Sequence, residues 1–303
     1  MSNKIGNILN LLRIRQYYKN IMIFVGIFFS FRLFESSLYF DLLIGFIILC
    51  CASSINYIIN DIRDVEKDKV HPEKLKKRPL ASGAISITFG ICILVILFLI
   101  IIFSVIFLIP HIGFISMVIL IIATGQIYNH LLKNYAFIDI LILSTGYIWR
   151  ALAGCMIIDE YVSAWLFLAI FEIALFLSIA KRKGDLIYLG NDTATDHKKV
   201  YDQYSLKLLE QFHVIIAGSL FMTYSLYLID KFSLLTTSSF QGYLAIFTIP
   251  ISLYLLMRYM YLTTSKPKIA RSTERAFLDK GMIIAGLILL IILFFSFYSE
   301  KLF

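Results

Sequence analysis

The chain has 303 residues, of which 59% are hydrophobic and 16% are charged, and its mean hydropathy is +0.82. Soluble domains carry about 25% charged residues, so this composition excludes a soluble globular protein and indicates an integral membrane protein. The formal net charge of +8 does not indicate nucleic-acid binding, because no basic stretch with interleaved aromatic residues lies outside the loops that flank apolar segments. The four cysteines lie inside apolar segments, without the spacing of a metal site or a disulfide framework.

Apolar segments long enough to cross a bilayer, which takes about 17–25 residues, recur along the whole chain. Nine are predicted, at residues 17–34, 42–60, 85–109, 112–130, 136–157, 164–180, 208–229, 243–262 and 281–299. No low-complexity linker or separate polar domain interrupts the series. We therefore predict an all-α polytopic membrane protein with nine transmembrane helices in a single domain over residues 1–303.

The 28 Lys and Arg residues are divided unequally between the two sides of the predicted membrane. With nine spans, most fall on the side that holds the N-terminus, whereas the opposite side holds Arg32, Lys231 and Lys301. Cytoplasmic loops carry the excess of Lys and Arg in membrane proteins, so the N-terminus is predicted to be cytoplasmic. The two longest and most charged loops, at residues 61–84 and 181–207, then place any chemistry at the cytoplasmic face of the inner membrane.

An acidic cluster follows the second predicted span, and a basic loop follows the cluster. Asp61, Asp64 and Asp68 stand at positions i, i+3 and i+7, so a continuous helix would place the three carboxylates on one face. Like charges repel unless a cation lies between them, and Mg²⁺ often bridges one or two carboxylates to substrate phosphates. Basic residues of the next loop, such as Arg78, could bind the remaining phosphate charge. The alternative is a solvated cytoplasmic connector, although such a loop needs no three aspartates on one face.

These residues resemble the first signature of the UbiA superfamily of intramembrane prenyltransferases. Its pattern N-D-x-x-D-x-x-x-D is matched here by Asn60, Asp61, Asp64 and Asp68. The resemblance extends over essentially the whole chain and implies the nine-helix architecture of the superfamily. The decaprenyl-phosphate phosphoribosyltransferase-like branch is the most similar, because His71-Pro72 and the stretch Arg-Pro-Leu-Ala-Ser-Gly at residues 78–83 match sequences typical of that branch.

The second charged loop distinguishes the branches of the superfamily. Aromatic prenyltransferases carry a second D-x-x-x-D after their sixth helix, whereas residues 181–186 read Lys-Arg-Lys-Gly-Asp-Leu. That stretch is similar to the K-R-x-x-E-L of the phosphoribosyltransferase branch, with Asp185 in the place of Glu. Asp192 and Asp196 form a D-x-x-x-D further on, which we interpret as a chance match in a polar loop. Tyr204 lies in a segment that resembles the branch's R-x-x-L-x-x-Y-S.

Arg150 lies inside a predicted span, where a charge costs about 2.5–3.5 kcal/mol at the helix centre. Two interpretations stay open: contact with a lipid phosphate or a polar cavity, and an internal contact with a carbonyl oxygen or with Glu172, which also lies in a span. Lys19 and Asn20, at the start of the first span, could likewise hold a lipid phosphate, or Lys19 could be an ordinary snorkelling lysine. His71 could contact phosphate or be a turn residue before proline.

The resemblance implies a Mg²⁺-dependent enzyme with 5-phosphoribose 1-diphosphate as donor and a polyprenyl phosphate as acceptor. It implies Mg²⁺ ligands at Asp61, Asp64 and Asp68, with Lys181 and Asp185 as further catalytic residues. The expected substrate-binding residues are Lys19, Asn20, Asn60, His71, Arg78, Tyr128, Lys133, Arg150, Arg182 and Tyr204. The expected partners are these two substrates and membrane lipids, with no nucleic acid, and the oligomeric state stays open.

Two other functions are consistent with parts of the sequence. An aromatic or quinone-type prenyltransferase would hold a prenyl diphosphate through Mg²⁺ on the same aspartates, but the missing second aspartate motif argues against it. A transporter or channel would be favoured by paired intramembrane charges and discontinuous helices, of which the sequence offers Arg150 and Glu172.

Overall fold

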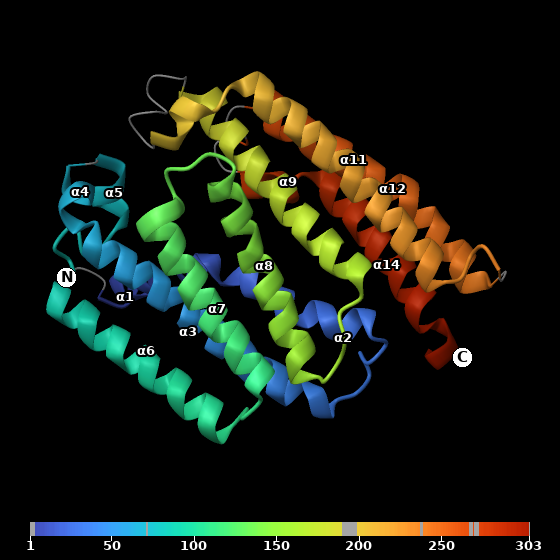
Figure 1. Ribbon diagram of the computed structural model, residues 1–303, viewed down its shortest axis with the longest axis horizontal. Helices are drawn as coiled ribbons and strands as arrows, with labels where there is room; N and C mark the ends of the chain where they lie inside the picture. Colours follow the sequence, from blue (N-terminus) through green and yellow to red (C-terminus); the bar gives the residue numbers. More distant parts are fainter. Residues whose placement is uncertain are drawn as a thin grey trace. The chain divides into compact units, whose positions relative to one another are not determined.

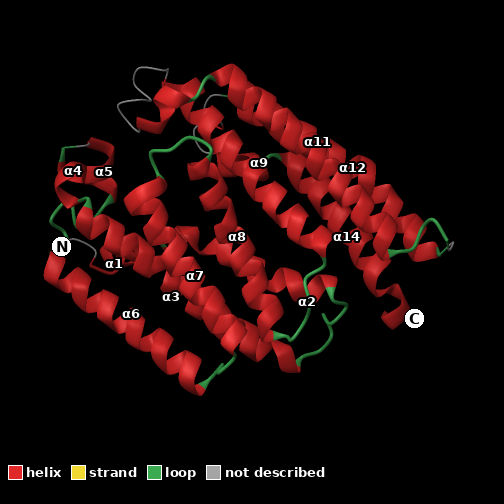
Figure 2. Cartoon of the chain, in the orientation of Figure 1, coloured by secondary structure: helices red, strands yellow, loops and turns green. Residues whose placement is uncertain are grey.

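The computed structural model describes residues 4–70, 72–189, 199–236, 239–266, 269 and 273–302. These residues form helices and turns, and no β-strand occurs among them (Figure 2), which confirms the predicted all-α class. The chain divides into two compact units, which we call unit 1 (Met1–Leu131 and Gly146–Val162) and unit 2 (Leu132–Thr145 and Ser163–Phe303). The single domain expected over residues 1–303 stays a prediction.

Unit 1 is organised around α3 (Ser37–Arg63), against which most of its other helices pack. These are α1 (Lys4–Leu12), η1 (Ile14–Phe24), α6 (Ile87–Phe107) and α7 (Ile112–Ile127) (Figure 1). The middle of α3 is buried over a run of small side chains, from Cys50 through Ala52 to Ser54. Small residues let helix backbones approach closely in a membrane. As a result, α3 is the most completely buried long helix, and its last turn ends at the acidic cluster.

Short elements complete unit 1 and connect its long helices. They are α2 (Val25–Phe29), α4 (Val65–Lys69), α5 (Pro72–Lys77), η2 (Tyr128–Leu132) and residues 146–157 of α8 (Ile138–Ile157). The N-terminus of α6 is capped by Ser86, whose hydroxyl accepts a hydrogen bond from the backbone N–H of Phe89 at 3.2 Å. Such a cap supplies one of the partners that the first turn of a helix lacks.

Unit 2 is built from four long helices that pack in chain order. They are α9 (Ala164–Leu189), α11 (Leu206–Lys231), α12 (Phe240–Ser265) and α14 (Lys280–Leu302), with the short helices η3 (Lys199–Gln203) and η4 (Thr273–Leu278) beside them (Figure 1). Ser205 and Ser239 cap α11 and α12 by accepting from backbone N–H groups at 3.1 and 3.0 Å. A serine directly before an apolar run is a signal for a helix start, and here it marks both starts.

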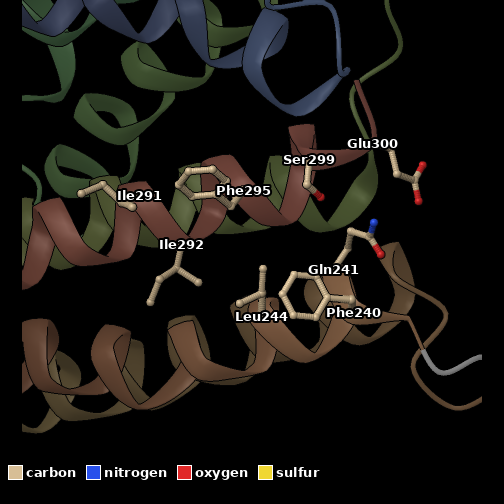
Figure 3. A pocket seen from close by; sticks show the side chains of 8 residues that line it. All are labelled: Phe240, Gln241, Leu244, Ile291, Ile292, Phe295, Ser299 and Glu300. Atoms are coloured by element: carbon tan, nitrogen blue, oxygen red, sulfur yellow. The ribbon is translucent and has the colours of Figure 1, made fainter. Parts of the chain in front are cut away.

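A hollow of about 670 Å³ lies between α12 and α14 in unit 2 (Figure 3). Its lining is mostly apolar and consists of Phe240, Gln241, Leu244, Ile291, Ile292, Phe295, Ser299 and Glu300. None of the residues predicted to form the site lines it.

Eight helices among the described residues are long and apolar enough to cross a membrane, which confirms a polytopic membrane protein. They correspond to eight of the nine predicted spans. The remaining segment, residues 17–34, is not one continuous α-helix, because it passes from the 3₁₀ helix η1 into α2 and then into turns. The count of nine and the cytoplasmic N-terminus therefore stay predictions.

We predict that Gly154→Ala destabilises unit 1. A Cβ atom at Gly154 in α8 would lie 1.8 Å from the carbonyl oxygen of Ile23 in η1, and backbone atoms cannot yield as a flexible side chain can. Overpacking of this kind costs about 1–3 kcal/mol, which would appear as a lower midpoint of thermal unfolding in detergent. The matched control is Gly218→Ala in α11, where a Cβ meets nothing within 4 Å and the midpoint should hold or rise. Equal midpoints for both variants would contradict the close approach of η1 and α8.

Candidate functional site

The acidic cluster lies where α3 passes into α4. Asp61 is in the last turn of α3, Asp64 stands between the two helices, and Asp68 is in α4. The predicted continuous helix is thus interrupted at Asp64, although the backbone N–H groups of Asp64 and Asp68 still donate to the carbonyls of Asn60 and Asp64 at 3.0 and 2.9 Å. Asp61 and Asp68 are buried, with exposed fractions of 2% and 1%.

Arg78 brings the carboxylates of Asp61 and Asp68 together. Its Nη1 lies 3.0 Å from Oδ1 of Asp61 and also donates a short hydrogen bond to Oδ2 of Asp68. Arg78 is positioned by the tight turn that follows it, in which Gly83 has φ +73° and the N–H of Ser82 donates to the Arg78 carbonyl at 3.0 Å. Only glycine adopts such a φ without strain. The carboxylates of Asp61 in α3 and Asp68 in α4 therefore converge on a single guanidinium nitrogen.

Arg13 approaches Asp61 from a distant part of the sequence. Its Nη2 donates to Oδ1 of Asp61 at 2.5 Å, and its guanidinium carbon lies 4.6 Å from the ring centroid of Tyr57. The sequence by itself does not pair Arg13 with Asp61, because nothing local to Arg13 points to that carboxylate. Two cations thus neutralise the buried carboxylates of Asp61 and Asp68.

Asp64 and Asn60 point to a different partner, Arg63. Arg63 donates through Nε to Asp64 at 3.3 Å and through Nη2 to the side chain of Asn60 at 3.3 Å. The same Nη2 donates to the backbone carbonyl of Asn129 in η2 at 3.0 Å. Within the described ranges, no three Asp, Glu, His or Cys side chains are gathered closely enough to hold a metal ion by themselves. The metal role of all three aspartates stays a prediction.

Arg150 in α8 forms a second polar centre of unit 1, inside a span. Its guanidinium donates to Oδ1 of Asn20 at 2.7 Å, to the hydroxyl of Ser53 at 3.2 Å and to the backbone carbonyl of Gly146. All of these partners are neutral, and no described carboxylate lies within ion-pair distance of it. The internal contact with a carbonyl, one of the two interpretations from the sequence, is thus present. It leaves the charge of Arg150 uncompensated.

Tyrosines and Lys19 surround this second centre. Tyr57 and Tyr147 lie close enough to Arg150 to interact with it electrostatically, and Lys19 interacts with Tyr147 in the same way. Tyr57 therefore interacts with both Arg13, which stacks on its ring, and Arg150. The acidic cluster and the cationic centre are neighbours within unit 1.

The residues predicted in unit 2 belong to a buried network. Arg182 of α9 donates to Oδ2 of Asp139 through Nε and Nη2 at 2.9 and 2.8 Å, and Tyr204 donates to Oδ1 of the same aspartate at 2.6 Å. Tyr201 of η3 donates to Oδ2 of Asp185 at 2.5 Å. Arg182, which was expected to bind phosphate, is therefore paired with a carboxylate, and its substrate role stays a prediction.

Burial raises the pKa of the Tyr201 and Tyr204 phenols well above the ordinary value of 10.0, and their hydrogen bonds to carboxylates add to the rise. Both phenols are therefore donors throughout the working pH range. They hold η3 and the residue after it against α8 and α9 in unit 2. Tyr201 was not found from the sequence, because a tyrosine in a polar loop carries no distinguishing signal.

The other predicted site residues are less clearly placed by their contacts. Lys181 in α9 and Lys133 after η2 are half-buried, as is Tyr128 in η2. His71 lies outside the described residues, as do Asp192 and Asp196. Glu172, the other charge noted inside a span, accepts a short hydrogen bond from Ser219 within unit 2.

Comparison with known proteins gives a family match. Residues 20–281 match the model of the UbiA prenyltransferase family. Proteins named decaprenyl-phosphate phosphoribosyltransferase are similar in sequence: the one from Mycolicibacterium smegmatis is 27% identical over 236 residues, covering 76% of this chain and 72% of its own length. The one from Mycobacterium tuberculosis is 26% identical over 234 residues, covering 76% of each chain.

Solved structures share the fold. A UbiA homolog from Archaeoglobus fulgidus bound to DMAPP and Mg²⁺ aligns with a TM-score of 0.66, covering 98% of this chain and all of that one, at 15% identity. A digeranylgeranylglyceryl phosphate synthase structure aligns with a TM-score of 0.63 at 17% identity, covering 98% of each chain. At these identities the likeness shows the fold alone.

We predict that Asp139→Asn strongly destabilises unit 2. The substitution leaves the buried guanidinium of Arg182 without its counter-ion, which costs about 3–5 kcal/mol in comparable buried pairs. The control is Asp279→Asn, because Asp279 pairs with Arg258 at 3.0 Å but that arginine is 32% exposed, so water can replace the carboxylate. Thermal unfolding and the folded fraction by size-exclusion chromatography would measure both variants. Similar losses for the two would mean that the Asp139–Arg182 pair is not buried as described.

Proposed function

Because the chain belongs to the UbiA prenyltransferase family, we propose that it transfers 5-phosphoribose from 5-phosphoribose 1-diphosphate to a polyprenyl phosphate. The products are polyprenyl-phosphoryl-5-phosphoribose and diphosphate. The names of its curated relatives support this substrate pair. The observation that carries the proposal is the convergence of Asp61 and Asp68 on Arg78, in the same unit as Arg150, which has no carboxylate partner among the described residues.

The donor set of the acidic cluster fits Mg²⁺. Carboxylate oxygens are the ligands that this hard cation prefers, and it usually takes one or two of them together with substrate phosphates. Asp61 and Asp68 already face one shared positive group, the Arg78 nitrogen, and Asp64 is the third candidate ligand. When bound there, Mg²⁺ would neutralise the negative charge that develops on the departing diphosphate. A solved UbiA homolog is bound to DMAPP and Mg²⁺, which supports the use of this metal in the family.

The protein's own cations would bind and orient the two anionic substrates. Arg78 would hold diphosphate oxygens of the donor through its fork of N–H donors. Arg150, with Lys19 near it, would hold the phosphate of the lipid acceptor, because its hydrogen-bond partners among the described residues are all neutral and leave its charge available. Lys181 and Asp185, in unit 2, are the further residues that we propose for catalysis.

The bond changes need no strong general base. An oxygen of the acceptor phosphate forms a bond to C1 of the sugar while the bond from C1 to the diphosphate oxygen breaks, and diphosphate leaves with the electron pair. A phosphate monoester has its second pKa at about 6, so the attacking oxygen is already ionised near neutral pH. Catalysis would then come from positioning and from electrostatic stabilisation of the leaving group. We place the reaction at the cytoplasmic face, with the lipid tail in the bilayer.

We predict that purified protein with Mg²⁺, 5-phosphoribose 1-diphosphate and a polyprenyl phosphate forms the phosphoribosylated lipid. Mass spectrometry of the lipid fraction would detect it, and EDTA should abolish it.

Asp64→Asn should lower the rate by about 10²-fold or more, as loss of one charge-stabilising group does, while leaving the protein folded because Asp64 is partly exposed. If folded wild-type protein forms no such lipid but transfers a prenyl group from a prenyl diphosphate to an aromatic acceptor, the protein is an aromatic prenyltransferase and the proposed function is wrong.

We predict that Arg150→Gln raises the KM for the lipid acceptor and leaves the KM for the sugar donor nearly unchanged. A lost hydrogen bond from a charged donor costs about 1.5–3 kcal/mol, so the KM should rise about tenfold or more. Initial rates at varied acceptor concentration would measure it. Arg258→Gln is the control, since that cation also lies in a span but pairs with Asp279. An equal effect on both KM values would contradict the assignment of Arg150 to the acceptor.

A further inference from the structure

We propose that Arg13 is a phosphate-binding residue that exchanges partners during substrate binding. Without metal it neutralises Asp61, and once Mg²⁺ lies on Asp61 it turns to the diphosphate of the donor. The inference rests on the proposed function and adds a residue and an order of events to it.

The backbone of Arg13 is held in an unusual conformation at the site. Arg13 has φ 53° and ψ 47°, in the left-handed region, which is uncommon for residues other than glycine and persists where the surroundings impose it. The neighbouring carbonyl of Leu12 accepts a hydrogen bond from Ser54 of α3 at 2.8 Å, and the N–H of Gln16 donates to the Arg13 carbonyl at 2.8 Å. The chain is thus fastened to α3 at the residue before the arginine, and a local turn follows it. Strain of this kind at a charged residue is typical of functional positions.

The side chain of Arg13 reaches a buried carboxylate and still has a free surface. It contacts Asp61, which is 2% exposed, while its own side chain is 26% exposed. Stacking on Tyr57 fixes the plane of the guanidinium. A guanidinium carries five N–H donors, and the ion pair with Asp61 occupies one of them. The remaining donors and the exposed edge can therefore meet a diphosphate, which guanidinium groups bind through paired hydrogen bonds.

The ion pairs of the cluster favour such an exchange. Asp61 and Asp68 carry two negative charges, and Arg13 and Arg78 carry two positive charges within ion-pair distance of them. Two cations thus already lie on the carboxylates that a metal would use. A divalent cation on the same carboxylates adds two positive charges and competes with Arg13 for Asp61. The excess is relieved when the anionic donor arrives and the displaced guanidinium binds it.

Metal and donor should then bind together rather than independently. While the donor is absent, Arg13 lowers the affinity for the metal. Once the metal is bound, Arg13 raises the affinity for the donor. Its removal should consequently have opposite effects on the two affinities. A purely structural arginine would weaken both on removal, and an arginine with no part in the site would change neither.

The test measures Mn²⁺ binding to the purified full chain by electron paramagnetic resonance of free Mn²⁺, with and without 5-phosphoribose 1-diphosphate and without acceptor. Arg13→Gln should bind Mn²⁺ about threefold or more tightly without donor, because one competing cation of a buried pair is gone. With Mn²⁺ saturating, the same variant should bind the donor about tenfold or more weakly, the effect of one lost charge-assisted hydrogen bond. Arg13→Lys keeps the charge but not the fork, so its Mn²⁺ affinity should stay near that of the wild type while its donor affinity falls.

Arg15→Gln is the matched control. Arg15 lies two residues away, is exposed, and forms no ion pair with any described residue, so neither affinity should change. Thermal unfolding of each variant would verify that it is folded. If Arg13→Gln is unfolded, the binding measurements on Arg13→Lys serve as the test.

The outcomes separate the two proposals. If wild-type protein binds neither Mn²⁺ nor the donor, the proposed function fails and the exchange fails with it. If the wild type binds both but Arg13→Gln weakens Mn²⁺ binding or leaves it unchanged, the exchange is overturned and the proposed function stands. If Arg13→Lys, as the folded variant, binds donor as tightly as the wild type, the phosphate-binding role of Arg13 is overturned.

Discussion

The ion pairs around Asp61 and Asp68 connect the parts of unit 1 on which the candidate site depends. Two carboxylates are buried at the end of a membrane-spanning helix, where an unpaired charge would be costly. Their compensation comes from Arg13, before η1, and from Arg78, after α5. Three segments that are remote in sequence are thereby held at one place. The helices α3 and α4, the N-terminal segment and the Arg-Pro turn are therefore joined at one candidate site.

Arg182 and Arg150 show opposite ways of placing a cation in a membrane protein. Arg182 has a carboxylate partner, Asp139, and two tyrosines complete that network. Arg150 has an amide, a hydroxyl and a backbone carbonyl, which orient the guanidinium without neutralising it. A cation whose charge is already matched contributes to the fold. A cation held by neutral groups can attract an anionic ligand, and it is expensive to keep unless it does.

The proposed reaction mainly requires cationic side chains at defined positions. An ionised acceptor phosphate and a diphosphate leaving group need cations at defined places. Unit 1 supplies Arg13 and Arg78 at the carboxylates, and Arg150 with Lys19 at the second polar centre. Tyr57 stacks on Arg13 and is within electrostatic range of Arg150. The donor and acceptor phosphates would thus be bound by adjacent surfaces of the same unit.

The sequence alone determined the class of the protein and the residue types of its site. Long apolar runs can be stable in lipid only as helices, because every backbone polar group needs an internal partner there, and eight of the nine predicted spans are such helices. The spacing of Asn60, Asp61, Asp64 and Asp68 was likewise readable, since it is local. The first span could not be predicted correctly as one helix, because its backbone follows the contacts of η1 with α3 rather than its own hydropathy.

Only the tertiary structure determined which acidic side chain pairs with which basic side chain. Asp64 turns to Arg63 while Asp61 and Asp68 share Arg78, a division that the interruption between α3 and α4 produces and that an ideal helix would not. Arg13 and Arg15 are equivalent in sequence, yet the left-handed backbone at Arg13 directs that side chain to Asp61. The physical reason is that a sequence pattern specifies neighbours along one helix face, whereas contacts between distant segments depend on how the helices pack.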